Sequence, residues 1–231
     1  MRCVVIHGYD TYGHSAMTDR ARLRTWGTTG ALSLLVIVVC VLVTRDGAVP
    51  SAERDVFRWI NELPDVLETP MVAVQYLGVA VVPFIVAAVA AILRQWRLVI
   101  AALLVYPLKL LVEKAILKEI VQRPRPARTE PDAILRHAPA DGLSFPSGHS
   151  IVAFALAGII SPYVSKGWRI VAFALATGVA FSRIYLGAHN PLDVVAGAAG
   201  GLLIAAVLNL VLFPKPASET RRPAATTTRG A

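Results

Sequence analysis

Apolar runs close to the length of a bilayer crossing dominate this sequence and limit the folds open to it. A transmembrane helix needs roughly 20 predominantly apolar residues, and runs of about this length recur along the 231-residue chain. Hydrophobic residues make up 55% of the chain and charged residues only 16%, whereas a soluble domain carries about 25% charged residues. Because unpaired backbone polar groups are costly in lipid, such runs cross it as helices. The sequence therefore predicts an all-α integral membrane helical bundle.

Six candidate transmembrane helices follow from these runs. They cover about residues 26–43, 70–93, 98–117, 149–165, 168–185 and 191–213. The third candidate is interrupted by Lys109, Glu113 and Lys114. Lys109 and Glu113 are four residues apart and could form a structural ion pair, although charges inside a span also suggest a functional role.

The runs divide the chain into three parts. An N-terminal tail covers residues 1–25, a six-span domain residues 26–213, and a C-terminal tail residues 214–231. The Pro-, Ala- and Thr-rich composition of the C-terminal tail is typical of disorder. We interpret the first span as an uncleaved anchor, with Met17 as an alternative start.

The distribution of charge predicts which loops face the cytoplasm. If the N-terminus is cytoplasmic, the inner segments hold 12 basic and 3 acidic residues, and the outer segments hold 11 basic and 12 acidic residues. Loops rich in Lys and Arg stay on the cytoplasmic side, so both termini are predicted to be cytoplasmic. These segments explain the net charge of +8, which does not indicate a nucleic-acid partner. Cys3 and Cys40 give no disulfide framework.

This topology brings three polar clusters to the outer face, because spans three and five end there and spans four and six begin there. The clusters lie in the stretches KEIVQRPRP, FPSGHS and SRIYLGAHNPLD. Their members are Lys118 and Arg125; Ser147, Gly148 and His149; and Ser182, Arg183, His189 and Asp193. We expect these residues to form one site.

The second cluster has the pattern of a helix start that binds an anion. Ser147 is a possible N-cap, and the free backbone N–H groups of the first turn attract anions together with the helix dipole. Gly148 and His149 follow directly, so His149 would lie close to a bound anion. Taken alone, the pattern also fits a helix start with a structural histidine.

The third cluster pairs a histidine with a carboxylate. Asn190 suits an N-cap and Pro191 the first helical position, which places Asp193 in the first turn, within reach of His189. A carboxylate that holds one imidazole nitrogen makes the other nitrogen a better base or nucleophile. A structural hydrogen bond and part of a metal site are the alternatives, but no further Cys, Glu or His lies nearby at ligand spacing.

Three cations complete the predicted site. Lys118, Arg125 and Arg183 add positive charge, and the two guanidinium groups suit the oxygens of a phosphate. Two histidines, one carboxylate, three cations and a helix N-terminus together indicate a phosphate-ester site. The same cations would repel a metal ion, so no metal and no cofactor is expected. The residues do not indicate which histidine attacks the phosphorus.

Three motifs resemble the signature of the type 2 phosphatidic acid phosphatase superfamily, which includes membrane lipid phosphatases and the vanadium haloperoxidases. Residues 118–126 read Lys, six residues, Arg-Pro; residues 146–149 read Pro-Ser-Gly-His; residues 182–193 read Ser-Arg, five residues, His, three residues, Asp. The order and spacing match at every signature position. Haloperoxidases would be expected as soluble proteins, so the apolar spans favour a membrane phosphatase.

The resemblance implies a mechanism with a phosphoenzyme. His189 would attack phosphorus and form a phosphohistidine, and Asp193 would orient and polarise His189. His149 would protonate the leaving oxygen and then activate water for the second step. The groups that would hold the phosphate oxygens are Lys118, Arg125, Arg183 and the segment Ser147–Gly148.

A lipid phosphate is the expected substrate, because the site lies at the outer mouth of the predicted bundle. Polyprenyl diphosphate is preferred. Phosphatidylglycerophosphate and phosphatidic acid are alternatives, as are a small water-soluble phosphate and a phosphotransfer reaction. A protein of another class, which binds or transports a lipid phosphate without turnover, would keep the anion site. The sequence does not indicate an oligomeric state.

Overall fold

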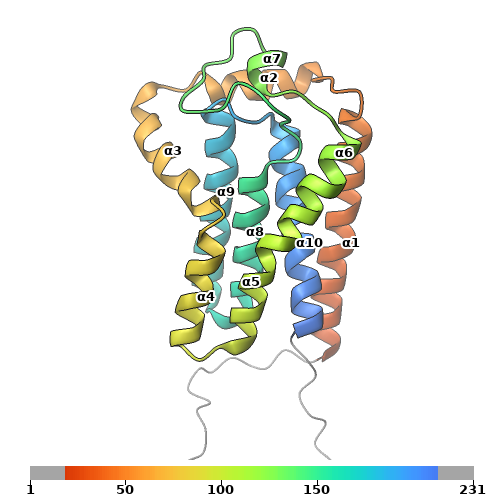
Figure 1. Ribbon diagram of the computed structural model, residues 1–231, viewed down its shortest axis with the longest axis vertical. Helices are drawn as coiled ribbons and strands as arrows, with labels where there is room; N and C mark the ends of the chain where they lie inside the picture. Colours follow the sequence, from red (N-terminus) through yellow and green to blue (C-terminus); the bar gives the residue numbers. More distant parts are fainter. Residues whose placement is uncertain (1–18, 213–231) are drawn as a thin grey trace, which may run out of the picture.

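Helices make up most of the described structure, and the long ones run along one axis (Figure 1). The computed structural model describes residues 19–212. Within this range the only extended pairing is an isolated bridge between Pro124 and Leu143, so the predicted all-α fold class is confirmed. The labels η1, η2 and η4 denote 3₁₀ turns, and η3 denotes a π-helix. In chain order the elements are α1 (Asp19–Thr44), α2 (Ser51–Asn61), η1 (Asp65–Leu67), α3 (Glu68–Gln75), η2 (Tyr76–Gly78), α4 (Val82–Ile92), α5 (Trp96–Leu110), η3 (Leu111–Leu117), α6 (Lys118–Ile120), α7 (Pro126–Thr129), α8 (Gly148–Ile160), η4 (Ser161–Tyr163), α9 (Lys166–Tyr185) and α10 (Pro191–Leu212).

The predicted spans correspond to helices of this bundle. Among the described residues, length and composition qualify Arg20–Thr44, α9 and α10 as membrane spans, and a bent pair of helices as a fourth. The predicted spans at 98–117 and 149–165 correspond to α5 with η3 and to α8 with η4, which pack in the same bundle. Six crossings therefore remain a prediction.

Of the two predicted tails, only the end of the N-terminal one overlaps the described residues. Helix α1 already begins at Asp19, so the last residues of the tail predicted over 1–25 are helical. The remainder of that tail and the tail over 214–231 lie outside the described residues, as does Met17.

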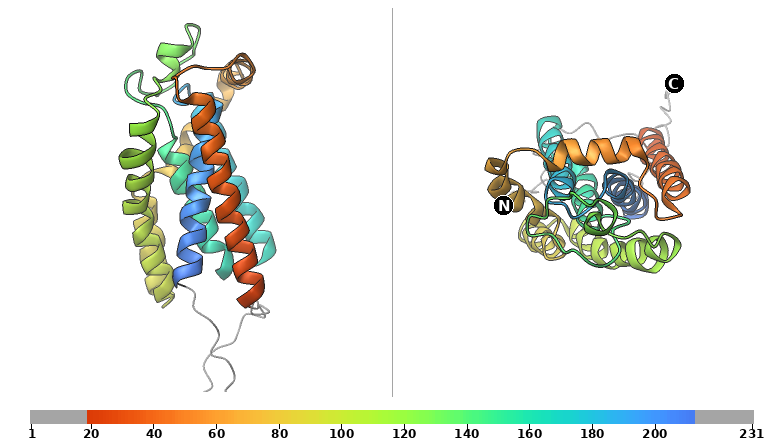
Figure 2. Two further views of the ribbon diagram at one scale, coloured as in Figure 1. Left: turned by 90° about the vertical axis from the view of Figure 1, so that its right-hand side faces the viewer. Right: turned by 90° about the horizontal axis from the view of Figure 1, so that it is seen from above.

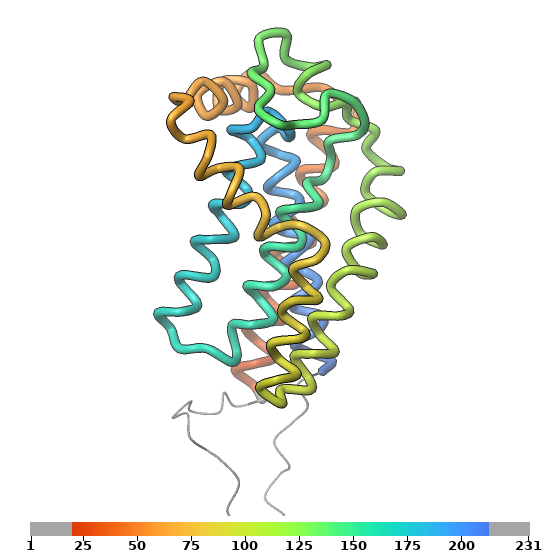
Figure 3. The backbone as a smooth tube through the Cα atoms, turned by 60° about the vertical axis from the view of Figure 1, so that its left-hand side comes forward, coloured from red at the N-terminus to blue at the C-terminus, as the bar shows by residue number. Residues whose placement is uncertain are grey.

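The second predicted span is not one straight helix. Its two halves, Asp65–Gly78 and Val82–Ile92, meet at an angle of 63° (Figure 3). Pro83 lies in the first turn of α4, and because proline has no N–H to continue a preceding helix, it starts a new one there. At the break, Gly78 lies against α8: a Cβ at this residue would be 2.7 Å from the carbonyl oxygen of His149.

Helices α8 and α10 approach each other at backbone distance. A Cβ at Gly201 would lie 2.4 Å from the carbonyl oxygen of Ile151, and one at Gly197 would lie 2.5 Å from that of Ser147. Small residues permit such contact between membrane helices, where packing rather than the hydrophobic effect drives association. The contact fixes the start of α8, and with it the PSGH motif, against α10.

Helix α2 lies across one end of the bundle, close to perpendicular to the long helices (Figure 2). Its inward side chains at 53, 57 and 60 follow helical spacing, and Phe57 and Ile60 pack with Ile184 and Tyr185 near the end of α9. We call this the α2 end. The loops between α6 and α8 and between α9 and α10 lie at the same end.

Candidate active site

A cavity of about 440 Å³ at the α2 end brings the three sequence clusters together. Six of the nine residues in these clusters line it: Lys118, Arg125, Gly148, His149, Arg183 and His189. The other three, Ser147, Ser182 and Asp193, are fully buried and do not line the cavity. Residues more than 70 positions apart in sequence thus share one polar cavity, as the topology predicts.

Ser147 takes a different place from the one predicted. It occupies the N-cap position of α8, but its side chain makes no capping hydrogen bond. Its Oγ accepts a hydrogen bond from the Ser150 hydroxyl (3.1 Å), and its backbone N–H donates to the Asp193 carbonyl (2.9 Å). Ser147 therefore joins the second motif to the third, and the cavity is lined by its neighbour Gly148.

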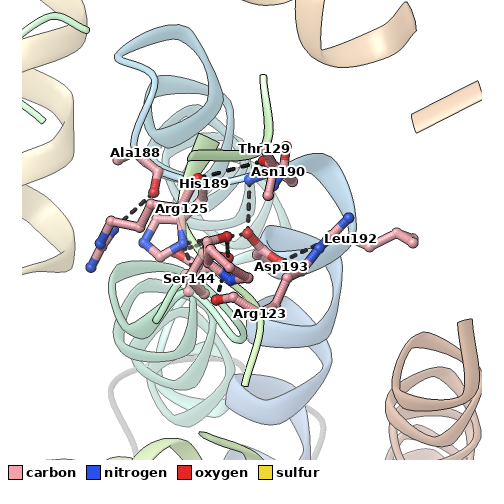
Figure 4. Close-up of polar contacts among 12 residues, drawn as sticks. Arg123, Arg125, Thr129, Ser144, Ala188, His189, Asn190, Leu192 and Asp193 are labelled. Atoms are coloured by element: carbon pink, nitrogen blue, oxygen red, sulfur yellow. Dashed lines mark hydrogen bonds and ion pairs between the residues drawn. The ribbon is translucent and has the colours of Figure 1, made fainter. Parts of the chain in front are cut away.

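His189 is anchored through Nδ1 (Figure 4). This atom lies 2.8 Å from the carbonyl oxygen of Ser144 and 3.8 Å from Oδ2 of Asp193. The shorter distance is a hydrogen bond and the longer one is not. The Nδ1 proton thus points at a backbone carbonyl beside the carboxylate, which differs from the direct histidine–aspartate bond predicted. Nε2 remains free of this anchor and is the nitrogen available to a substrate in the cavity.

The surroundings of His189 favour the neutral imidazole. Burial lowers the pKa of His189 to about 4; Asp193 opposes this shift and the Arg183 guanidinium adds to it. At neutral pH the ring is therefore deprotonated at one nitrogen, which a nucleophile requires.

The two arginines of the cavity are held by protein oxygens. Arg125 donates from Nη1 to the Ala188 carbonyl (2.8 Å) and from Nε to the Asp141 carbonyl (3.0 Å). Arg183 donates from Nη1 to Oε1 of Gln75, whereas its Nε is buried without a hydrogen-bond partner among the described residues. Burial lowers the pKa of Arg125, which stays charged at neutral pH because arginine starts so high. Both guanidinium groups keep N–H groups for an anion.

Two lysines and a glutamate line the third side of the cavity. Glu113 accepts from Nζ of Lys118 through Oε1 and pairs with Nζ of Lys109 through Oε2, both at 2.6 Å. The π-helix η3 explains the first pair. In an α-helix, positions 113 and 118 would point about 140° apart, whereas the wider π turn, with its i to i+5 repeat, brings them together. Lys109 also packs against Gly148: a Cβ at position 148 would lie 3.0 Å from the Cε atom of Lys109.

Sequence reasoning missed three residues that contact the site. Arg123 donates to Oδ1 of Asp193 (3.0 Å), Glu53 binds Arg123, and Gln75 binds Arg183. Glu53 could have been noticed, because it occupies a position of the apolar stripe that Phe57 and Ile60 continue. Arg123 sits beside the signature Arg125 in a stretch that reads as a stiff loop, and no pattern distinguishes Gln75.

Among residues 19–212, no group of three or more His, Cys, Asp or Glu side chains is placed to hold a metal ion. The carboxylates near the histidines are already engaged. Asp193 accepts from Arg123 and from the backbone N–H of Asn190, and Glu113 lies between two lysines.

The fold and the cavity define a helical membrane protein with a cavity lined by two histidines and several cationic side chains. The chain belongs to the PAP2 superfamily, whose family model matches residues 94–216. Phosphatidylglycerophosphatase B of Bacillus subtilis (strain 168) is 30% identical over 193 residues, which are 74% of this chain and 88% of that protein. The resemblance to the type 2 phosphatidic acid phosphatases is thus confirmed.

Two further comparisons agree with this assignment. The undecaprenyl-diphosphatase BcrC of Bacillus subtilis (strain 168) is 38% identical over 71 residues, which are 30% of this chain and 34% of that protein. The crystal structure of a transmembrane PAP2 type phosphatidylglycerolphosphate phosphatase from Bacillus subtilis superposes with a TM-score of 0.63 at 24% identity, covering 78% of this chain and 94% of that one. At this identity the superposition supports the fold alone.

Proposed function

We propose that this protein is a membrane lipid phosphatase that hydrolyses a phosphate ester or diphosphate through a phosphohistidine. The observation that carries the proposal is the meeting of His149 and His189 with Lys118, Arg125 and Arg183 in one cavity. Relatives named as a phosphatidylglycerophosphatase and an undecaprenyl-diphosphatase support a lipid phosphate as substrate.

The reaction takes two steps at one phosphorus atom. Nε2 of His189 attacks, the bond from phosphorus to the leaving oxygen breaks, and His149 delivers a proton to that oxygen. His149 then takes a proton from water, the water oxygen attacks the phosphohistidine, and His189 is released with inorganic phosphate. The cations stabilise the charge that spreads over the equatorial oxygens in each transition state.

The charge of the cavity favours a diphosphate over a monophosphate. Four cationic side chains line it, Lys109, Lys118, Arg125 and Arg183, and Glu113 is the carboxylate among them, which leaves three positive charges. A phosphomonoester carries roughly two negative charges near neutral pH, and a lipid diphosphate carries about one more. We therefore propose polyprenyl diphosphate as the substrate, with Lys109 contacting its second phosphate, and keep phosphatidylglycerophosphate and phosphatidic acid as alternatives.

The orientation of the protein belongs to the same proposal. Both termini face the cytoplasm, and the α2 end with its cavity faces outward. The excess of basic residues in the segments at the opposite end supports this placement. The tails over 1–25 and 214–231 then flank the membrane domain on the inner side.

Release of inorganic phosphate by the purified protein in detergent tests the proposal. The panel compares a polyprenyl diphosphate with the monophosphate of the same tail, then phosphatidylglycerophosphate and phosphatidic acid, with His189→Ala as the inactive control. We expect turnover of the diphosphate that survives excess EDTA and is inhibited by vanadate, which imitates the five-coordinate transition state. Activity that chelator abolishes and one divalent metal restores would exclude this mechanism, and binding without phosphate release would indicate a lipid-phosphate binding or transport protein.

The role of Lys109 is tested separately on the matched pair of lipids. Lys109→Met should lower kcat/KM for the diphosphate by about tenfold, the loss expected for one charge-assisted hydrogen bond, and change it much less for the monophosphate. Equal losses on both lipids would contradict a contact with the second phosphate.

A further inference from the structure

Arg123 is among the largest fully buried side chains of the protein, and no step of the proposed mechanism uses it. It lies between α6 and α7, at the α2 end, with none of its surface exposed. A buried guanidinium is costly unless its N–H groups are paired with acceptors and its charge is balanced. Its partners therefore indicate what it is for.

Two carboxylates from distant parts of the chain share this guanidinium. Glu53 of α2 accepts from Nη1 (2.9 Å) and from Nη2 (2.5 Å), the two-pronged geometry typical of a strong arginine–carboxylate pair. Nη1 also donates to Oδ1 of Asp193 (3.0 Å), and Nη2 donates to the Ala48 carbonyl (3.0 Å). Burial alone would lower the pKa of Arg123, but the hydrogen bonds and charges of Glu53 and Asp193 raise it above its ordinary value.

The main chain of Arg123 also reaches the nucleophile (Figure 4). The backbone N–H of Ser144 donates to the carbonyl oxygen of Arg123 (2.8 Å), and the carbonyl oxygen of the same Ser144 lies 2.8 Å from Nδ1 of His189. One residue thus fixes both neighbours of Nδ1: Asp193 through its side chain and Ser144 through its backbone.

Glu53 holds the start of α10 as well. Its Oε1 accepts the backbone N–H of Leu192 (2.8 Å), in the first turn of the helix that carries Asp193. The second oxygen of Asp193 accepts the N–H of Asn190 (2.8 Å). The charged members of this network, Glu53, Arg123 and Asp193, are all buried, so the position of each is determined by its partners.

The balance of charge has a chemical consequence. Two carboxylates and one guanidinium leave one net negative charge beside His189, whose ring becomes positive once Nε2 is bonded to phosphorus and Nδ1 keeps its proton. Without Glu53, Arg123 would neutralise Asp193, and that net charge would be lost. The network then stabilises the phosphohistidine step more than it stabilises substrate binding.

We propose that Arg123 and Glu53 are positioning residues, which hold Asp193 and Ser144 against His189 and keep one negative charge beside it, so that α2 is part of the catalytic machinery. The proposal rests on the proposed phosphatase function. It concerns residues that do not touch the substrate, and its failure is therefore distinct from failure of the function: wild-type turnover tests the function, and the variants below test the network.

The matched pair Glu53→Gln and Arg54→Gln tests this network. Both residues lie on α2, and Arg54 pairs through Nε with the buried Glu130 of the loop between α7 and α8 (3.0 Å to each carboxylate oxygen) without contacting Asp193. Glu53→Gln should lower kcat and the rate of phosphoenzyme formation about a hundredfold, as expected when a reacting group is misplaced, with KM changed less than about twofold. Arg54→Gln should leave kcat within about twofold.

Two more variants keep the test decisive if Glu53→Gln does not fold. Arg123→Lys retains the buried charge but loses the fork, and should show the same split between kcat and KM. Glu53→Asp retains the carboxylate, so its kcat should be higher than that of Glu53→Gln. If Glu53→Gln is not obtained, the kcat of Glu53→Asp should be higher than that of Arg123→Lys. Equal losses in Glu53→Gln and Arg54→Gln, or a full kcat in Arg123→Lys, would show that the network only supports the fold and would overturn the proposal.

Discussion

The two histidines of the cavity differ in their surroundings, and the difference matches the division of roles proposed for them. His189 is buried and anchored at Nδ1, whereas His149 is half-buried in the first turn of α8 and lines the cavity. A nucleophile gains from a fixed ring, and a group that gives and takes a proton needs access to both the leaving oxygen and water.

His149 can be tested through the leaving group. With a lipid substrate, His149→Ala should lower kcat by about a hundredfold or more, in the range of general acid catalysis. With nitrophenyl phosphate the loss of phosphoenzyme formation should be much smaller, because nitrophenolate leaves without a proton. A burst assay of nitrophenol release measures this step. Equal losses on both substrates would show that His149 is not the leaving-group acid.

The buried His189 predicts a dependence of stability on pH. Its pKa is about 4 in the folded protein and about 6.5 in an unfolded chain, so the unfolded state binds the proton more readily. The neutral His189 ring contributes its full stabilisation above pH 6.5, and this stabilisation is lost as the pH falls toward 4. At pH 5 the loss amounts to about 2 kcal/mol. Thermal unfolding in detergent at pH 7 and pH 5 should show a smaller loss for His189→Gln than for the wild type. Identical losses would contradict a neutral, buried His189.

At the scale of helices, the close contact of α8 with α10 sets the position of the PSGH motif. Gly201→Ala places a Cβ 2.4 Å from the Ile151 carbonyl oxygen and 2.8 Å from the Ala155 nitrogen, both backbone atoms that cannot move alone. The helices must separate, and we expect a loss of 1–3 kcal/mol or more, about the cost of overpacking, together with lower activity. Gly27→Ala in α1, where no atom lies within 4 Å, is the matched control and should be neutral or slightly stabilising. Thermal unfolding midpoints in detergent compare the two.

Helix periodicity explains which parts of the structure could be predicted from sequence. The apolar runs predict the helices closely, for example Trp168–Tyr185 against α9 at Lys166–Tyr185, and the three motifs predict six residues of the cavity. Periodicity does not predict where a helix breaks, so the bend between α3 and α4 was missed. Nor does it predict the π turn that pairs Glu113 with Lys118, since the α repeat points them apart. Contacts such as Glu53 with Arg123, 70 residues apart, depend on tertiary structure alone.

For the whole molecule, the proposed orientation makes an accessibility prediction. Asp132 lies in the loop between α7 and α8, at the end proposed to face outward, and its side chain is 80% exposed. Asp132→Cys should therefore react with an impermeant maleimide in intact cells. Gln95→Cys, in the exposed turn between α4 and α5 at the opposite end, should react only after permeabilisation. Cys3→Ser in both variants removes one background thiol, and Cys40 is buried. The reverse pattern would place the cavity on the cytoplasmic side.

The π turn η3 (Leu111–Leu117) has a consequence for natural variants of this chain. A π turn is an α-helix that holds one residue too many, so deleting a single residue within it, such as Ala115, would restore the α repeat. The deletion would leave every signature residue and every spacing from Lys118 to Asp193 intact, and a motif search would still report a complete enzyme. In the regular helix Lys118 would then follow Glu113 by four residues, the spacing of a favourable helical ion pair, so the contact between the two side chains would be kept. Among homologous genes, a one-residue gap just before the first motif would therefore mark a protein that keeps both the full signature and this ion pair without the π turn.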